Sequence, residues 1–175
     1  EIMPSLVGSE MCIRDRTTEN IFIGMESPNN SFQKVPAIIE QQVPGWRGIP
    51  IEEAYAGETM AYMMEKGRDF VGPDGESIRE VQKRATNWLE DELIYNRKLC
   101  RDPQTLTVAI IGHGNTMRSI FHYIMGFDQR LTYKIGVDNT SISRFIFNSK
   151  GWSVVCLNDS SHLKTNSTGT FETRS

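Results

Sequence analysis

The stretch that most constrains the fold of this chain runs from Leu106 to Met125. Val108 to Ile111 is an uninterrupted apolar run, which is typical of a strand buried on both faces of a parallel sheet. The turn Gly112-His113-Gly114-Asn115 follows directly, and apolar residues then recur at helical spacing up to Ile124. A strand, a glycine turn and a helix in this order predict a βα unit of an α/β sheet.

This unit places His113 where α/β proteins bind ligands. Ligands of open α/β sheets lie at the carboxyl ends of the strands, and a helix N-terminus favours anions. The glycines on either side of His113 would let a phosphate-sized group approach the backbone closely. On this stretch alone, a buried histidine in an ordinary βα turn is an equally good interpretation.

Composition narrows the class of protein. A chain of 175 residues predicts one domain, and its net charge of −3 gives no reason to expect a nucleic-acid or membrane partner. No apolar run approaches the roughly 18 residues of a membrane span, and the first residues lack the pattern of a signal peptide. The three cysteines are far apart and show no metal-binding spacing. We therefore expect a cytoplasmic protein with no metal and no cofactor, while its oligomeric state stays open.

The first residues read differently from the remainder. Residues 1–16 show no sustained period, and the run PSLVGSEMCIRDR within them resembles a translated sequencing adapter. We expect this segment to be artefactual or disordered and leave it out of the fold prediction; a genuine irregular N-terminus is the alternative. Residues 17–163 are predicted to form the domain, and the polar residues 164–175 a disordered tail.

Several further elements are predicted from local patterns. Gly72 to Gly75 is a strong turn signal, and Ser77 with Glu80 forms a capping box that opens a helix reaching about Tyr95. The other predicted elements are a helix end at 18–25, a loop at 26–36, a helix at 51–66 weakened by Gly57, and a hairpin of strands 141–148 and 152–157.

A second candidate for chemistry is Glu40. Two isoleucines precede it and a Gly/Pro/Trp turn follows. Partial burial at this point would make the carboxyl hold its proton more readily, as a general acid requires. The alternative is a solvated side chain before a turn. Glu76 has a simpler interpretation, favourable electrostatics at a helix N-terminus.

Taken together, five segments resemble the histidine phosphatase (phosphoglycerate mutase-like) superfamily. The resemblance covers residues 17 to about 163 and lies in the order of the segments as much as in any one of them. The segments are IIEQQVPGWRG with Glu40, Trp46 and Gly48 in register, Gly75-Glu76-Ser77 with Val81 and Arg84, VAIIGHGNTMR, Asp138-Asn139-Thr140-Ser141-Ile142, and Leu157-Asn158-Asp159 with His162-Leu163. Pro44 stands where the family usually has glycine.

The resemblance implies a three-layer α/β/α fold with a mostly parallel sheet and a two-step phosphoryl transfer through a phosphohistidine. His113 would be the second histidine of the site and would hold the phosphoryl oxygens. Glu40 would protonate the leaving alkoxide and then activate water. The Gly114 N–H and the Asn115 side chain would contact the phosphate, and the partner would be a small phosphorylated substrate.

One departure from the family is large. The nucleophilic histidine of the family lies in an Arg-His-Gly motif, which this sequence lacks, and its other histidines are His122 and His162. The position that corresponds to a second phosphate-binding arginine is Ile13, inside the segment set aside. We therefore expect an N-terminally truncated, inactive copy whose first, central strand is missing. Arg118 receives no role.

Three functional hypotheses follow. The first is a phosphatase or mutase whose nucleophile is missing from this polypeptide. The second is a non-catalytic phosphate-binding or interaction module of the same fold. The third is an unrelated α/β protein in which His113 is structural. The sequence does not identify the substrate, nor does it distinguish a phosphatase from a mutase.

Overall fold

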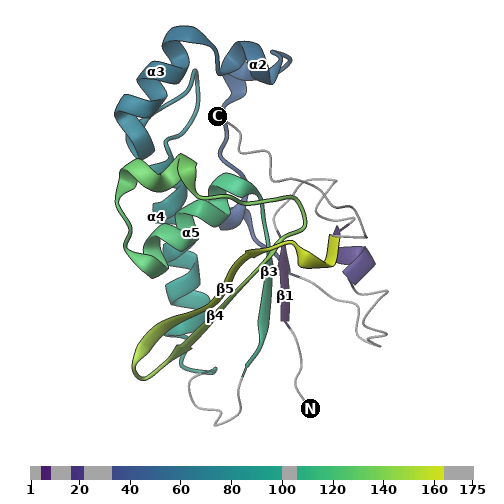
Figure 1. Cartoon of the computed structure of the whole chain (residues 1–175). Helices are drawn as coiled ribbons and strands as arrows, with labels where there is room; N and C mark the ends of the chain where they lie inside the picture. Colours follow the sequence, from purple (N-terminus) through teal and green to yellow (C-terminus); the bar gives the residue numbers. More distant parts are fainter. Residues whose placement is uncertain (1–4, 9–16, 22–32, 100–105, 164–175) are drawn as a thin grey trace. The chain divides into compact units, whose positions relative to one another are not determined.

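A computed structural model of the chain describes residues 5–8, 17–21, 33–99 and 106–163 (Figure 1). The chain divides into two compact units, of which the first ends at Ile135 and the second begins at Gly136. No helix in the described ranges combines the length and the apolar character that a membrane span needs.

The first unit is built on a short parallel sheet. Its strands are β1 (Ser5–Gly8), β2 (Gln33–Lys34) and β3 (Val108–Ile111), in the order β2-β1-β3. Both pairings of β1 are parallel. The predicted α/β class with parallel pairing is therefore confirmed, although the β3 side chains are half-buried rather than fully enclosed.

The central strand of this sheet comes from a segment that the sequence analysis set aside. We expected the first strand to be missing, but Ser5–Gly8 runs beside β3 along its whole length, from Ser5 opposite Val108 to Gly8 opposite Ile111. Backbone pairing is available to almost any extended segment, so four residues with only Leu6 and Val7 as large apolar side chains can occupy a strand position without a longer sequence pattern that predicts it. That residues 1–16 are artefactual stays a prediction.

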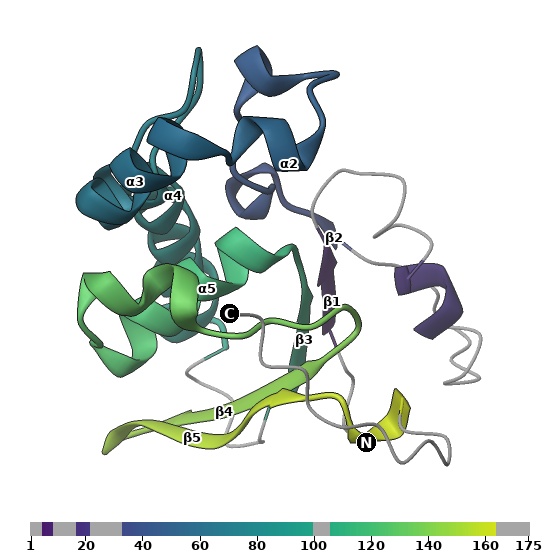
Figure 2. The ribbon, with the colours of Figure 1, turned by 45° about the horizontal axis from the view of Figure 1, so that its top comes forward.

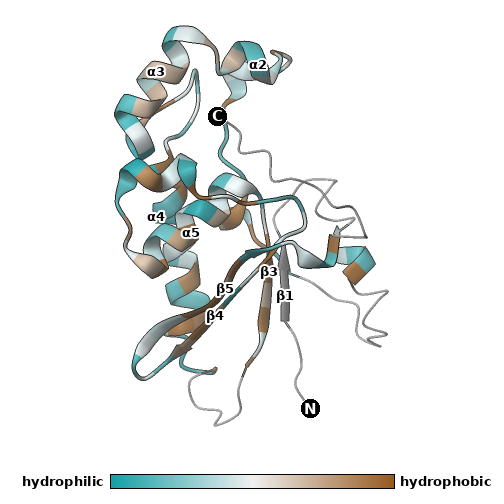
Figure 3. Cartoon of the chain, viewed as in Figure 1, coloured by the Kyte–Doolittle hydropathy of each residue, from teal (hydrophilic) through white to brown (hydrophobic). Residues whose placement is uncertain are grey.

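Two amphipathic helices pack side by side next to β3 (Figure 2). Helix α4 (Ile78–Leu89) begins with the predicted capping box, in which Ser77 and Glu80 each accept the other's backbone N–H. Helix α5 (Gly114–Met125) ends at Gly126, whose φ of 62° is the left-handed cap conformation. Figure 3 shows hydrophobic residues on β3 and along one side of these helices. The buried apolar side chains include Ile38, Ile78, Val81, Ala85, Leu89, Ile120 and Phe121.

Elsewhere the first unit differs in detail from the prediction. The helix expected at 51–66 is split into α2 (Ile51–Ala54) and α3 (Gly57–Lys66), because Gly57 takes a φ of 53° that breaks the helical hydrogen bonding. Helix α4 continues as a wider π turn over Glu90–Ile94. Residues 18–21 of the helix end predicted at 18–25 are helical, and residues 22–25 lie outside the described residues, as does most of the predicted loop.

The second unit is the predicted hairpin. Strands β4 (Ile142–Asn148) and β5 (Gly151–Asp159) are antiparallel, and the tight turn lies at Lys150-Gly151 with a φ of 95° at the glycine. Asp138 and Asn158, which belong to the last two family-like segments, hydrogen bond to one another: the Asp138 N–H donates to Asn158 Oδ1 at 2.7 Å, and Asn158 Nδ2 donates to Asp138 Oδ2 at 3.1 Å. These two segments therefore form one structural feature.

Candidate functional site

His113 occupies the position that the sequence predicted. Gly112 alone separates it from the end of β3. It is the N-cap of α5, in an extended conformation with φ −100° and ψ 171°. Its carbonyl accepts the Met117 N–H at 2.9 Å, and its Nε2 atom is buried. The imidazole thus stands at the carboxyl end of a parallel strand and at the start of a helix.

Glu40 lies at the same helix start. Its Oε2 accepts the backbone N–H of Asn115 at 3.1 Å, and its Oε1 accepts the N–H of Gln41 at 2.6 Å. Thr116, which is fully buried, donates from Oγ1 to the carbonyl of Ile39 at 2.8 Å. Because these contacts join residues about 75 positions apart, the segment around Glu40 is fastened directly to the first turn of α5.

A chain of side-chain hydrogen bonds runs across this turn. Asn115 Nδ2 donates to Gln41 Oε1 at 3.0 Å, and Arg118 Nη1 donates to Asn115 Oδ1 at 3.0 Å. Arg118 also donates from Nε to the carbonyl of Ile135 at 2.9 Å. These contacts fix the side-chain amide of Asn115 in one orientation. The backbone N–H of the same residue donates to Glu40.

Arg84 and Glu76 hold the Glu40 segment from the other side. Arg84 pairs with Glu76 through Nη2–Oε1 at 2.8 Å and Nε–Oε2 at 3.1 Å. The same guanidinium donates to the carbonyls of Ala37 at 2.7 Å and Glu40 at 3.3 Å. Glu76 in turn accepts the Gln42 N–H at 3.0 Å, and its carbonyl accepts Gln41 Nε2 at 2.8 Å. The backbone from 37 to 42 is therefore tied to the start of α4.

Close backbone packing explains why the residue before Glu76, Gly75, is a glycine. A Cβ on Gly75 would lie 2.6 Å from the Gln42 carbonyl oxygen and 3.0 Å from Val43 Cα, which leaves no room for a side chain. The Glu76 N–H donates to that same carbonyl at 3.0 Å. Glycine is thus required at this position because the segment after Glu40 lies directly against it.

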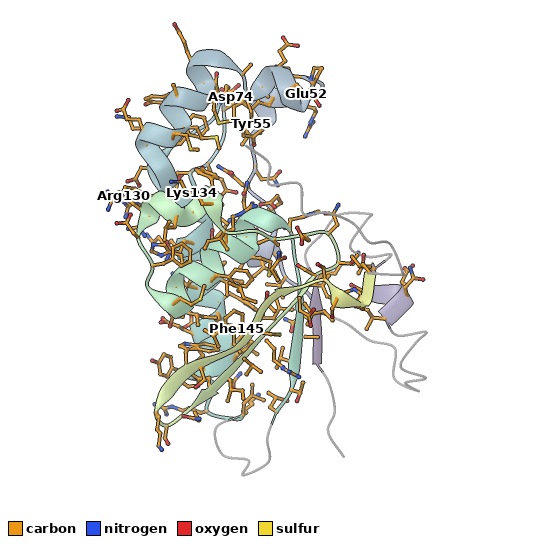
Figure 4. The ribbon with its side chains drawn as sticks, viewed as in Figure 1. Glu52, Tyr55, Asp74, Arg130, Lys134 and Phe145 are labelled. Atoms are coloured by element: carbon orange, nitrogen blue, oxygen red, sulfur yellow. The ribbon has the colours of Figure 1, made fainter. Side chains whose placement is uncertain are left out.

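The charged and phenolic groups near Glu40 are partly removed from water. Burial raises the pKa of Tyr55, and the Glu40 carboxylate raises it further. Burial also raises the pKa of Tyr133 to about 12. The pKa of Arg118 is lowered by burial, an effect opposed first by Glu40 and then by the two tyrosines. Tyr55 lies in the link between α2 and α3 (Figure 4).

An apolar cavity of about 320 Å³ lies beside this region. It is lined by Trp46, Thr59, Tyr62, Phe70, Val71, Gly72 and Pro73. The Trp46 ring stacks with Phe70 at a centroid distance of 5.9 Å and contacts Tyr55 at 4.9 Å. Trp46 therefore links the cavity wall to Tyr55, the tyrosine whose pKa is raised by the charge of Glu40.

The structure brings together all the residues selected from the sequence: His113, Gly114 and Asn115 are consecutive, and Glu40 is bonded to the last of them. Sequence reasoning missed Gln41, Arg118 and the Glu76–Arg84 pair. The sequence did contain a signal for the Glu76–Arg84 pair, since both residues belong to one family-like segment. Glu76 was nevertheless interpreted as a favourable charge at a helix N-terminus. Within the described residues, no group of three or more His, Cys, Asp or Glu side chains could hold a metal ion.

Comparisons with known proteins give a family and a fold. The sequence profile of the histidine phosphatase superfamily (branch 1) matches residues 14–160. Among curated proteins, no sequence matches significantly.

Solved structures with the same fold include YhfR of Bacillus stearothermophilus, with a TM-score of 0.74 at 16% identity over 93% of this chain and 77% of that one. A mycobacterial glucosyl-3-phosphoglycerate phosphatase matches with a TM-score of 0.72 at 14% identity, over 89% and 77%. A phosphoserine phosphatase of Entamoeba histolytica, solved with 3-phosphoglyceric acid, matches with 0.73 at 17%, over 91% and 76%.

Proposed function

This chain belongs to the histidine phosphatase superfamily, branch 1, and we propose that its site binds the phosphoryl group of a small phosphate ester at the start of α5. His113 would hold the phosphoryl oxygens together with the Gly114 N–H and the Asn115 side chain. Glu40 would be the proton donor to the leaving oxygen and then the base for water. The protein is proposed to act in the cytoplasm.

The contact between Glu40 and the Asn115 N–H is the observation that carries this proposal. A carboxylate that accepts a hydrogen bond from the first turn of a helix occupies the place where helices bind anions. Asn115 is two residues beyond His113, the N-cap of the same helix. The imidazole and the backbone N–H groups of this helix start would supply the positioning and the charge stabilisation on which phosphoryl transfer depends, and Glu40 would supply the proton.

The polypeptide is further proposed to lack turnover. In the family, phosphoryl transfer begins with attack by the histidine of an Arg-His-Gly motif, and the sequence contains no such motif. His122 lies within α5 and His162 follows the antiparallel hairpin of the second unit, so neither comes after a strand of the parallel sheet as His113 does. Glu40 and His113 would then serve a phosphoryl acceptor that this polypeptide lacks.

Binding and turnover are tested separately. Calorimetric titration of the full chain with inorganic phosphate is expected to show binding that His113→Gln weakens at least about tenfold, which corresponds to 1.4 kcal/mol. His162→Gln, in the second unit, is the matched control and should change nothing. Equal affinity in the two variants, or no binding by the unmodified chain, would contradict the proposed phosphate site.

Turnover is measured with p-nitrophenyl phosphate. We expect no hydrolysis that depends on His113, and His113-dependent hydrolysis would overturn the proposed inactivity. The coding sequence upstream of Thr17 then separates the two readings of the family. An in-frame Arg-His-Gly would indicate a phosphatase or mutase, and its absence would favour the second candidate, a phosphate-binding module without catalysis.

A further inference from the structure

Arg118 differs from several other arginines of the first unit in what it binds. Arg79, Arg84 and Arg130 each pair with an Asp or Glu side chain. Arg118 donates instead to two neutral acceptors, the Ile135 carbonyl at 2.9 Å and Asn115 Oδ1 at 3.0 Å. Within the part of the chain that the structure describes, no carboxylate lies within ion-pair distance of its guanidinium, and Nη2 makes no hydrogen bond.

The guanidinium of Arg118 lies over the first turn of α5. A Cβ built on Gly114 would be 3.1 Å from Nη1, so the cation rests against the glycine that follows His113. Its partner Asn115 is the residue whose N–H reaches Glu40. Arg118 therefore brings a positive charge to the helix start where the phosphoryl group is proposed to bind.

Glu40 opposes the charge of Arg118 in part, without forming an ion pair with it. Burial lowers its pKa, but a guanidinium keeps its proton at any physiological pH. The neighbouring phenols of Tyr55 and Tyr133 keep their protons as well, because burial raises the pKa of both. Glu40 is the acidic group that acts on Arg118, and it is hydrogen bonded to backbone N–H groups. A partly desolvated cation without an ion pair is costly unless an anion from outside completes the site.

We propose that Arg118 is a substrate-binding residue that holds an anionic oxygen of the phosphate ester. The inference rests on the proposed phosphate site and names a further residue of it. This oxygen belongs either to the phosphoryl group itself or to a second acidic group of the substrate. Arg118 is held by Ile135 and Asn115 in one orientation, so its Nη2 hydrogens are arranged in advance for such an acceptor.

The experiment compares three probes on the full chain by calorimetric titration: inorganic phosphate, glycerol 3-phosphate and 3-phosphoglycerate. If Arg118 holds the phosphoryl group, Arg118→Gln should weaken all three about tenfold or more. If it holds a second acid, Arg118→Gln should remove only the advantage of 3-phosphoglycerate over glycerol 3-phosphate, which lacks the carboxylate. Arg118→Lys, which keeps the charge, should lose less affinity than Arg118→Gln in either case.

Two comparisons make the result decisive. Arg79→Gln removes an exposed arginine of α4 and should leave all three affinities unchanged. If His113→Gln weakens binding but Arg118→Gln does not, the proposal for Arg118 is wrong while the phosphate site stands. If neither substitution changes binding, or if the unmodified chain binds none of the probes, the proposed function fails. Affinities that Arg118→Lys and Arg118→Gln lower equally would indicate that Arg118 only positions Asn115, and would also overturn the proposal.

Discussion

Arg84 grips Glu76 with two nitrogens and, with the same guanidinium, the carbonyls of Ala37 and Glu40. The pair is largely shielded from water, with 24% and 21% of the two side chains exposed, so its contacts are screened less than those of a surface ion pair. It joins the start of α4 to the backbone that carries Glu40. The orientation of Glu40 towards α5 therefore depends on a pair of residues that make no hydrogen bond to α5 themselves.

Removal of this pair should release Glu40. Arg84→Ala is expected to lower the free energy of unfolding by about 2 kcal/mol, since it removes the cationic partner of the Glu76 carboxylate and a donor to each of the carbonyls of Ala37 and Glu40. The specific readout is the Asn115 amide in NMR spectra, because its N–H donates to Glu40 and its chemical shift depends on that hydrogen bond. We expect the Asn115 amide signal to move in the variant, because Glu40 no longer lies against this N–H.

Arg79→Ala is the matched control for this prediction. It removes another arginine of α4, paired with Asp69 on the exposed side, and it should leave the Asn115 amide signal unchanged. An unaltered Asn115 amide signal in Arg84→Ala would show that Glu40 keeps its place without the Glu76–Arg84 pair.

The close approach of Gly75 gives a second prediction. Gly75→Ala should destabilise the fold by about 1–3 kcal/mol, because the new methyl group would lie 2.6 Å from the Gln42 carbonyl oxygen and force the segment after Glu40 outward. Chemical denaturation measures the loss. Gly48→Ala is the control: its φ of 84° strains a side chain, yet no atom lies within 4 Å of the added carbon. We expect Gly75→Ala to alter the Asn115 amide signal and Gly48→Ala to leave it in place.

Local patterns in the sequence predicted much of this architecture. The capping box at Ser77, the βα unit around His113 and the hairpin beyond Ser141 each depend on residues that are neighbours in the chain. Propensity, periodicity and turn chemistry act over that range. The split of the helix at Gly57 was signalled only as a weakness, since a glycine in a helix can bend it, break it or simply reduce its stability.

The contacts that shape the site leave no such pattern. Gln41 meets Asn115 across 74 positions, and Arg84 meets Ala37 across 47, so each depends on tertiary packing that no local period encodes. Arg118 received no role from the sequence because the case for it depends on the absence of an ion-pair partner among the described residues, which is visible only once its surroundings are known. The order of the family-like segments selected His113 and Glu40 as site residues. The hydrogen bond that holds Glu40 at the start of α5 became visible only in the structure.

His122 should make stability depend on pH. Burial lowers its pKa, and the cations of Arg68 and Arg79 lower it further. The unfolded chain therefore takes up the proton at higher pH than the folded chain does. The stabilisation is fully present above the unfolded pKa of about 6.5 and is lost as the pH falls through the lower, folded value. Urea midpoints measured from pH 8 down to pH 5 should fall, and His122→Gln should flatten that part of the profile.

Thr116 provides a test of the direct link between the Glu40 segment and α5. Its hydroxyl is fully buried and donates to the Ile39 carbonyl at 2.8 Å, so Thr116→Val, of nearly the same shape, would leave that carbonyl without a donor. We expect a loss of about 1–2 kcal/mol in the free energy of unfolding, together with faster hydrogen exchange at the Asn115 amide. Ser119→Ala is the matched control: its hydroxyl is also fully buried, but it donates to the Asn115 carbonyl inside the same helix. Its removal should cost less and leave the exchange at Asn115 unaltered. Equal exchange rates in the two variants would mean that the hydroxyl of Thr116 fills space in the core without holding Glu40 against the helix.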